Sequence, residues 1–207
     1  MYTHSKQIKT AGVAPADAKG ALIMIHGRGG TAANIISLAR DLNVNDMAIY
    51  APQAESQSWY PYSFMAPDAQ NQPALNSALS IIDETVQQAI NDGIPMHKIY
   101  FVGFSQGACL TLEYIARHAK PFGGAVAFTG GLIGEELNLD NYKGDFLGMP
   151  VLITTGNPDP HVPVSRVEES VKVLKNLDAA VTLKVYNGRP HTITFEEIEL
   201  ANQIVFA

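Results

Sequence analysis

The chain has 207 residues, 46% of them hydrophobic and 16% charged, and a formal net charge of −6. This size and composition are typical of one globular domain, so we expect a single domain over residues 1–207. Because the chain is acidic and contains no basic run, nucleic acid is excluded as an expected partner, and no apolar segment reaches the length of a membrane span.

The N-terminal segment and the cysteine content bear on cellular location. Residues 1–10 lack the apolar core of a secretory signal. Cys109 is the only cysteine, which rules out a disulfide within the chain and fits a reducing compartment. We therefore predict a cytoplasmic protein in which Cys109 is a small buried apolar residue.

The first half of the chain alternates strands and helices. Residues 21–25, Ala-Leu-Ile-Met-Ile, form an apolar run typical of a strand buried on both faces of a sheet. A glycine-rich loop follows at 26–30, and the aromatic and proline-rich residues 58–67 are too interrupted for a regular element. The elements expected up to Gly93 are, in chain order, a weak edge strand at 6–9, strand 21–25, a helix from Thr31 to about Leu42, strand 46–50 and a helix at 73–92.

The second half continues this alternation. The expected elements are, in chain order, strand 99–102, a helix after Ser105, strands 124–128 and 150–154, a helix capped by Ser165, strand 181–186 and a helix from Thr194 to about Phe206. Strands that alternate with helices predict an α/β fold, with a mostly parallel central sheet and helices on both faces. Ligands bind such sheets at the carboxyl ends of the strands, where most of the unusual polar loops of this chain fall.

Ser105 lies at the corner where a predicted strand becomes a helix, in Gly103-Phe-Ser-Gln-Gly107. Such a turn holds the serine in a strained backbone conformation with Oγ exposed, and the two glycines allow the strand and helix to pack closely. The helix N-terminus directs backbone N–H groups to the same place, where they would stabilise an oxyanion. The alternative is an ordinary serine in a glycine-bracketed turn, because the pattern is short.

A serine nucleophile needs a base, and the base needs an acid that fixes its tautomer. His191 follows strand 181–186 and Asp159 follows strand 150–154, so we predict them as base and acid. Asp140 and Asp145 are weaker candidates for the acid, because no strand precedes them in their long loop.

Six histidines compete for the role of base. Three of them lie away from this sheet edge and are predicted to be solvated surface residues: His4, His97 and His118. His26 and His161 lie at the correct edge, and His161 is the main rival of His191. It stands only two residues from Asp159, too close in sequence to face that carboxylate easily. No metal is predicted, because none of these residues shows the paired spacing of a zinc site.

The loop His26-Gly-Arg-Gly-Gly30 is expected to supply a second oxyanion donor, the backbone N–H of Arg28, beside that of Gln106. A phosphate-binding loop is the alternative, since this loop also follows a strand and opens a helix. It lacks the glycine spacing of dinucleotide-binding loops and the Gly-Lys-Ser/Thr ending of P-loops. The Arg28 side chain is predicted either to attract an anionic substrate group or to be solvated.

Taken together, these segments resemble the phospholipase/carboxylesterase family of small serine hydrolases, which includes bacterial carboxylesterases and acyl-protein thioesterases. The matching segments are His26-Gly-Arg-Gly-Gly30, Ser58-Trp-Tyr60, Gly103-Phe-Ser-Gln-Gly-Ala108, Gly156-Asn-Pro-Asp-Pro-His-Val-Pro163 and Pro190-His191. The resemblance implies an α/β-hydrolase fold with little or no cap, ester hydrolysis without a cofactor, and Ser105, Asp159 and His191 as the catalytic triad. The chain order Ser, Asp, His is also that of α/β-hydrolases.

Two positions depart from the family pattern. Gly30 stands where family members commonly carry Asp, and Pro190 stands where they commonly carry Gly before the histidine. We expect the first change to weaken the bracing of the oxyanion loop and the second to alter the presentation of His191. Both argue against transferring a substrate preference from the family to this chain.

We therefore predict a serine hydrolase that cleaves small-molecule carboxylic esters through an acyl-enzyme, with no cofactor. The alternatives are a thioesterase, a lysophospholipase or a dienelactone-type hydrolase, which use the same triad, or a non-catalytic binding protein with this fold. The sequence makes no prediction of oligomeric state. The residues expected to line the substrate pocket, or alternatively to pack in the core, are Trp59, Tyr60, Met65 and Leu132, with Tyr62, Phe64 and Ile133 as further candidates.

Overall fold

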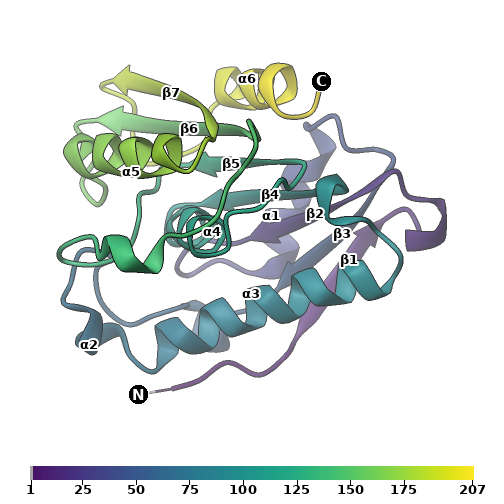
Figure 1. The fold of residues 1–207 in the computed structure, drawn as a ribbon, viewed down its shortest axis with the longest axis horizontal. Helices are drawn as coiled ribbons and strands as arrows, with labels where there is room; N and C mark the ends of the chain where they lie inside the picture. The colour runs from purple at the N-terminus through teal and green to yellow at the C-terminus, as the bar shows by residue number, and fades with distance from the viewer. Residues whose placement is uncertain (1) are drawn as a thin grey trace.

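A computed structural model describes residues 2–207, and one seven-stranded sheet lies at its centre (Figure 1). The strand order is β1-β3-β2-β4-β5-β6-β7. β1 runs antiparallel to β3, and every other neighbouring pair is parallel. The strands are β1 (Ile8–Gly12), β2 (Gly20–Ile25), β3 (Met47–Pro52), β4 (Ile99–Phe104), β5 (Gly124–Phe128), β6 (Pro150–Asn157) and β7 (Ala180–Asn187). The predicted α/β fold with a mostly parallel sheet is therefore confirmed.

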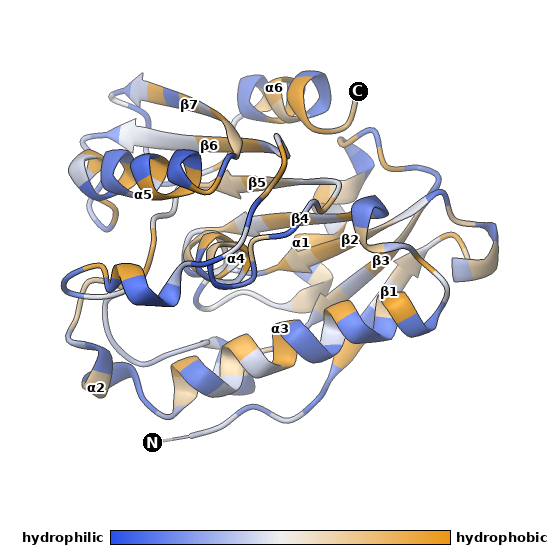
Figure 2. Cartoon of the chain, in the orientation of Figure 1, coloured by the Kyte–Doolittle hydropathy of each residue, from blue (hydrophilic) through white to orange (hydrophobic). Residues whose placement is uncertain are grey.

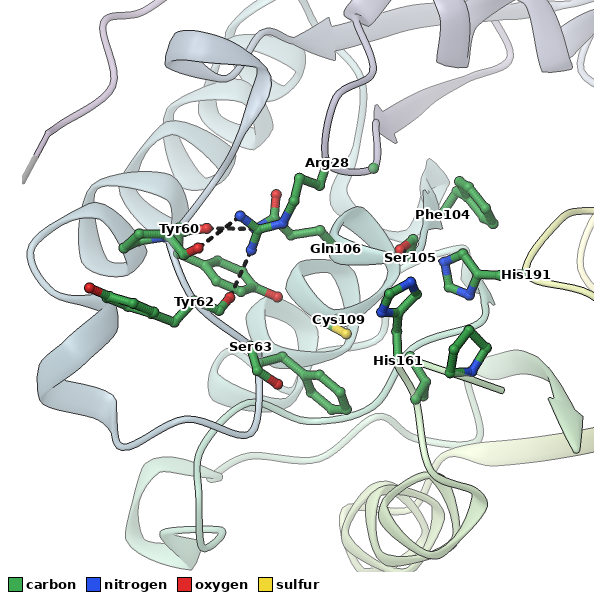
Figure 3. Close-up of a pocket in the computed structure, with 15 residues that line it drawn as sticks. Arg28, Tyr60, Tyr62, Ser63, Phe104, Ser105, Gln106, Cys109, His161 and His191 are labelled. Atoms are coloured by element: carbon green, nitrogen blue, oxygen red, sulfur yellow. Dashed lines mark hydrogen bonds between the residues drawn. The ribbon is translucent and has the colours of Figure 1, made fainter. Parts of the chain in front are cut away.

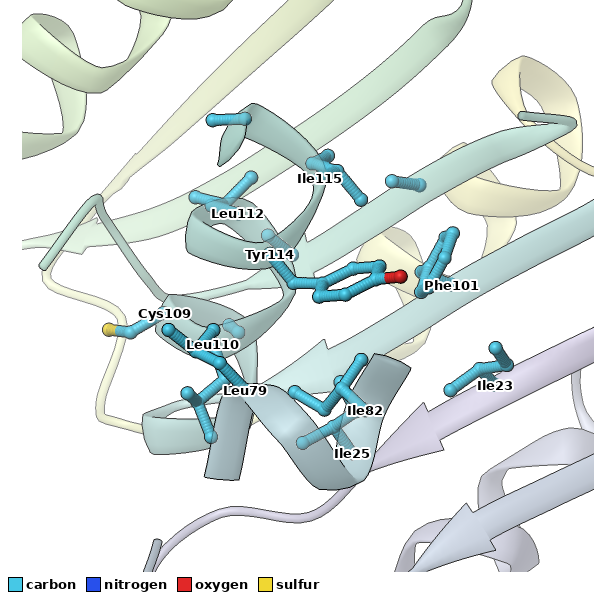
Figure 4. Close-up of a cluster of buried hydrophobic side chains, with 14 of the residues drawn as sticks. Ile23, Ile25, Leu79, Ile82, Phe101, Cys109, Leu110, Leu112, Tyr114 and Ile115 are labelled. Carbon is cyan, nitrogen blue, oxygen red and sulfur yellow. The ribbon is translucent and has the colours of Figure 1, made fainter. Parts of the chain in front are cut away.

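Helices cover both faces of this sheet. One face carries α3 (Ala74–Asn91), α4 (Gln106–Arg117) and α5 (Val164–Asn176), and the other carries α1 (Ala32–Ser37) and α6 (Phe195–Ile204). The alternation of β2 shows why both faces need cover. Ile23 and Ile25 pack with the first set, in the cluster drawn in Figure 4, whereas Leu22 and Met24 pack with the second.

The long helix α3 shows how burial on one side follows from the sequence. Leu75, Leu79, Ile82 and Val86 recur at helical spacing, and all four are buried against the sheet. Figure 2 shows the result as bands of orange and blue along α3. The helix ends at Asn91 with Asp92 as its C-cap, and Gly93 follows with φ of +96°, a conformation that favours glycine.

Within residues 2–207, no large cap of helices is inserted in the connections that follow β3 and β5 at the carboxyl ends of the strands. The two long connections, residues 53–73 and 129–149, contain only one short α-helix, α2 (Asp68–Asn71), and two 3₁₀ turns, Glu55–Gln57 and Leu139–Asn141. Every strand of the described residues 2–207 joins the one sheet. A single domain for the whole chain stays a prediction.

Some predicted boundaries are wrong in detail. Ser165 does not cap α5: it lies inside the first turn, and Pro163 occupies the N-cap without a side-chain bond. The helix that begins after Thr31 is shorter than expected, because α1 ends at Ser37 and a 3₁₀ turn follows at Leu38–Arg40. The Ser37 hydroxyl donates to the Asn34 carbonyl at 2.6 Å, a local bond that competes with regular helix.

The prediction that His4 is a solvated surface residue is wrong, whereas His97 and His118 are exposed as expected. His4 is buried, with Nε2 2.9 Å from the Trp59 carbonyl oxygen and Nδ1 accepting from the backbone N–H of Glu55 at 3.0 Å. The polar N-terminal segment thus packs against the connection after β3, a contact that local sequence does not reveal.

Candidate active site

The corner between β4 and α4 holds Ser105 in an unusual backbone conformation, with φ of 54° and ψ of −117°. Close packing on both sides maintains it. A Cβ at Gly107 would lie 2.1 Å from the Ile25 carbonyl oxygen, and one at Gly103 would lie 2.3 Å from the Gly107 carbonyl oxygen. Only glycine fits at these two positions, so the N-terminus of α4 sits directly against the end of β2 and Ser105 projects from the corner.

A continuous hydrogen-bond chain joins Ser105, His191 and Asp159. His191 Nε2 lies 2.8 Å from Ser105 Oγ, and His191 Nδ1 lies 2.8 Å from Asp159 Oδ2. With a proton on Nδ1, the imidazole donates to the carboxylate and accepts from the serine hydroxyl. Three loops that follow β4, β6 and β7 thus bring together the three side chains singled out from the sequence.

The surroundings of Asp159 keep its carboxylate ionised. Burial would raise the pKa of Asp159, but hydrogen bonds from His191 and from the backbone N–H groups of His161 and Val162 outweigh it and hold the pKa below its ordinary value. A carboxylate that stays charged can fix the histidine tautomer and stabilise an imidazolium.

The proposed oxyanion donors lie beside Ser105. Arg28 and Gln106 line the same cavity as Ser105 and His191, and a Cβ added to Gly27 would lie 3.4 Å from the Ser105 Cβ. Within residues 2–207, the backbone N–H groups of Arg28 and Gln106 have no hydrogen-bond acceptor. Two N–H groups next to a serine are therefore available to a substrate oxygen.

The rival histidines have other roles. His161 lines the cavity, and its ring meets that of His191 edge-on with centroids 5.1 Å apart, while its backbone N–H donates to Asp159. His26 is buried: its Nδ1 lies 2.7 Å from the Gly27 carbonyl oxygen, and its Nε2 accepts from the Ala54 backbone N–H at 3.1 Å. Burial lowers the pKa of His26 and favours its neutral form. His26 therefore braces the loop that carries Arg28.

The cavity in front of Ser105 has a volume of about 630 Å³ and is drawn in Figure 3. Its wall combines aromatic, small polar and apolar side chains, among them Tyr60, Tyr62, Ser63, Phe64, Phe104, Cys109 and Val162. The Cys109 thiol, where burial raises the pKa to about 12, is an uncharged part of this wall. A partly apolar wall of this kind fits an organic group.

Four of the residues predicted to form this wall do not line the cavity: Trp59, Met65, Leu132 and Ile133. Trp59 is fully buried, where its Nε1 donates to the His26 carbonyl at 2.8 Å and its ring lies against that of His26. Leu132 is also fully buried. The other three candidates, Tyr60, Tyr62 and Phe64, do line the cavity. Aromatic character alone does not tell a wall residue from one that packs behind it.

The Arg28 side chain is exposed, and its guanidinium is held by the segment that follows β3. It donates to the carbonyl oxygens of Pro61 at 2.9 Å and Tyr62 at 2.7 Å, and to Ser58 Oγ at 3.1 Å. The buried Gln106 side chain holds the same segment, since it accepts from the Trp59 N–H and donates to the Tyr60 carbonyl. Two residues predicted to act through their backbone thus also fix the cavity wall through their side chains.

Arg189 was not singled out from the sequence, and it supports the His191 loop. Its buried guanidinium donates to the carbonyl oxygens of Pro190 and Thr192, one on each side of His191, and to Thr129 Oγ1 at 2.6 Å. The buried Glu197 carboxylate lies 3.6 Å from Arg189 Nε and provides the counter-charge. The one feature of the sequence that could have pointed to this role is the position of Arg189, two residues before His191.

Two negative findings concern residues 2–207. They contain no helix long and apolar enough to cross a membrane. They also contain no group of three or more His, Cys, Asp or Glu side chains placed to hold a metal ion.

The fold and this site define a hydrolase of the α/β-hydrolase class. A family model described as phospholipase/carboxylesterase matches residues 13–205, so the chain belongs to that family. A crystal structure of a phospholipase/carboxylesterase from Dyadobacter fermentans is 63% identical and covers 100% of this chain and 99% of its own, with a TM-score of 0.99.

More distant relatives agree. Acyl-protein thioesterase 1 of Kluyveromyces lactis is 27% identical over 88% of this chain and 89% of its own. The Bacillus cereus carboxylesterase is 20% identical over 95% of this chain and 92% of its own, and its TM-score of 0.78 shows the shared fold.

Proposed function

We propose that this enzyme is a serine hydrolase that cleaves carboxylic esters, with Ser105 as nucleophile, His191 as general base and acid, and Asp159 as the orienting carboxylate. The observation that carries the proposal is the pair of 2.8 Å hydrogen bonds that link the three side chains. A binding protein would have no need for a strained serine at a helix N-terminus joined to an imidazole and a carboxylate.

The proposed reaction follows from the geometry. His191 Nε2 takes the proton of Ser105 as Oγ attacks the ester carbonyl, and Asp159 accepts the hydrogen bond from the resulting imidazolium. The backbone N–H groups of Arg28 and Gln106 stabilise the tetrahedral oxyanion. The alcohol leaves with the proton from His191, and water activated by the same histidine then releases the acid from Ser105.

The proposed substrate is a small-molecule ester, and none of these steps requires a cofactor. A thioester is the second candidate, favoured by the likeness to the Kluyveromyces lactis acyl-protein thioesterase. The cytoplasmic location predicted from the single cysteine is part of the proposal, and fractionation of source cells would test it.

Ser105→Ala tests the proposal. Loss of the nucleophile of a triad costs up to about 10⁶-fold in turnover, so hydrolysis of p-nitrophenyl acetate and labelling by a fluorophosphonate probe should both disappear. Ser63→Ala is the matched control, because Ser63 lines the same cavity but has no histidine partner among residues 2–207. Labelling that persists in Ser105→Ala and is lost in Ser63→Ala would contradict the assignment.

The choice of base has its own test. His191→Ala should reduce turnover far more than His161→Ala, since His191 alone bonds to Ser105 Oγ among the histidines of residues 2–207. The reverse order of the two variants would make His161 the base.

A further inference from the structure

A second cavity, of about 510 Å³, opens beside the Arg28 loop. It shares Gly27, Arg28 and Phe104 with the cavity in front of Ser105, so the two spaces meet at the loop. Figure 3 shows Phe104 and Tyr60 on opposite sides of the Arg28 side chain. A substrate whose carbonyl sits at Ser105 therefore has apolar space on either side of this loop.

We propose that the second cavity is the binding site for the alcohol part of the ester, and that it selects alcohols that are apolar and either uncharged or cationic. This inference rests on the proposed function. It assigns the acyl part to the cavity lined by Tyr60 and Cys109.

The position of the reacting residues determines which part of the substrate enters which cavity. His191 must deliver its proton to the departing alcohol oxygen, so the alcohol chain begins beside that imidazole. The Phe104 ring lies beside it, with centroids 5.3 Å apart, and Ile193 follows two residues later. Phe104 lines the first cavity together with Ser105 and His191, and it also lines the second cavity together with Ile193. The Phe104 ring therefore connects the reacting residues to the apolar wall of the second cavity.

The lining of the second cavity indicates the chemical class of the alcohol. Leu38, Phe104 and Ile193 are only partly buried, and they pack on the apolar layer that contains Ile35. Burial of an alkyl chain on this surface is favourable. Gly29 and Gly30 contribute no side chain on the loop side, which leaves the space open.

Asp41 adds a charge at the rim of this cavity. The residue is exposed, and within residues 2–207 no cationic side chain lies within salt-bridge distance of its carboxylate. Arg28 also lines this cavity, but its guanidinium is bonded to Ser58, Pro61 and Tyr62 on the side of the first cavity. The negative charge of Asp41 therefore faces this rim, where it repels alcohols that carry phosphate or sulfate and attracts cationic ones.

Two series of esters test the assignment. In the wild type, kcat/KM along methyl to octyl acetate should rise about three- to fourfold per methylene until the cavity is full. In Leu38→Trp, whose indole occupies the second cavity, the ratio of octyl to methyl acetate should fall about tenfold. The series of ethyl esters from acetate to octanoate should keep its dependence on acyl length.

Ser63→Trp is the matched variant in the other cavity, at an exposed position. It should change the dependence on acyl length and leave the ratio of octyl to methyl acetate as in the wild type. An alcohol series that is flat in the wild type overturns the inference. So does an alcohol ratio that responds to Ser63→Trp and not to Leu38→Trp, when fluorophosphonate labelling shows both variants to be folded. Absence of labelling in the wild type would instead overturn the proposed function itself.

The charge at Asp41 is tested with two acetates of the same shape. Acetylcholine carries a cationic alcohol, and 3,3-dimethylbutyl acetate is its uncharged analogue. Asp41→Asn should lower the ratio of their kcat/KM values about two- to fivefold, the scale of an exposed charge pair. A ratio that does not change overturns the preference for cationic alcohols.

Discussion

Arg28 and Arg189 hold the two loops that deliver the proposed oxyanion donor and the proposed base, and they use the same chemistry in different surroundings. Each guanidinium donates to two backbone carbonyl oxygens and to one hydroxyl. Arg28 does so while exposed to solvent, whereas Arg189 is buried beside Glu197. Water competes for the bonds of Arg28 but not for those of Arg189, so the two residues should differ in what their loss costs.

The two loops also differ in the buried group that supports each of them. The Arg28 loop rests on His26, a buried imidazole whose neutral form is favoured and whose ring is tilted against that of Trp59. The His191 loop rests on the ion pair of Arg189 and Glu197. The first support can gain a proton as pH falls, although burial lowers its pKa, while an arginine keeps its charge. The comparison therefore predicts different responses to mutation and to pH.

The largest effect is expected for Arg189→Met. Without the guanidinium the carbonyls on either side of His191 lose their donor, and a displacement of the imidazole by about 1 Å lowers kcat about 10²-fold. The buried Glu197 carboxylate also loses its counter-charge, which costs about 3–5 kcal/mol of unfolding free energy. Steady-state kinetics on a short ester and urea unfolding measure the two effects, and Arg189→Lys should restore part of each.

A double variant separates positioning from folding. In Arg189→Met combined with Glu197→Gln no uncompensated charge remains, so much of the stability should return while kcat stays low. If kcat returned together with stability, Arg189 would matter only for the fold.

Short-range features of the sequence predict the strands and helices. They also predict that Ser105, Asp159 and His191 lie close together. Apolar runs such as residues 21–25 predict buried strands, and the glycines around Ser105 predict the corner because a Cβ would clash there. The carboxyl ends of parallel strands share one edge, so His191 and Asp159 were expected near Ser105. Their catalytic roles stay a proposal.

Other features depend on contacts between distant segments, which local sequence does not encode. Trp59 was expected in the cavity wall, but His4 and His26 come from separate parts of the chain to cover it. The burial of Arg189 likewise depends on Glu197 in α6 and Thr129 after β5. The residues next to Arg189 in the sequence do not predict that Glu197 and Thr129 are its partners.

A smaller effect is expected for Arg28→Met. The backbone N–H stays in place, so the main loss is the attachment of residues 58–62 to the loop, and KM should rise about two- to fivefold, as for other exposed charged contacts. Stability should fall by about 1 kcal/mol. Kinetics and unfolding under the conditions used for Arg189→Met provide the comparison. A fall in kcat as large as that of Arg189→Met would mean that exposure does not distinguish the two arginines.

The smallest effect, and the sharpest contrast between the loops, is expected with pH. Burial is the main cause that lowers the pKa of His26 below its unfolded value, and the nearby His4 is a lesser one. The stability that comes from neutral His26 is therefore fully present above about pH 6.5 and is lost as pH falls through the folded pKa. The unfolding free energy of the wild type should therefore decrease from pH 7 to 5. His26→Gln should make that decrease shallower, whereas Arg189→Lys should leave its slope unchanged, because lysine and arginine are both charged over this range. His4→Gln, at another histidine whose pKa burial lowers, is the control for the share that does not come from the Arg28 loop. A slope that changes in Arg189→Lys but not in His26→Gln would place the pH-sensitive support under the His191 loop instead.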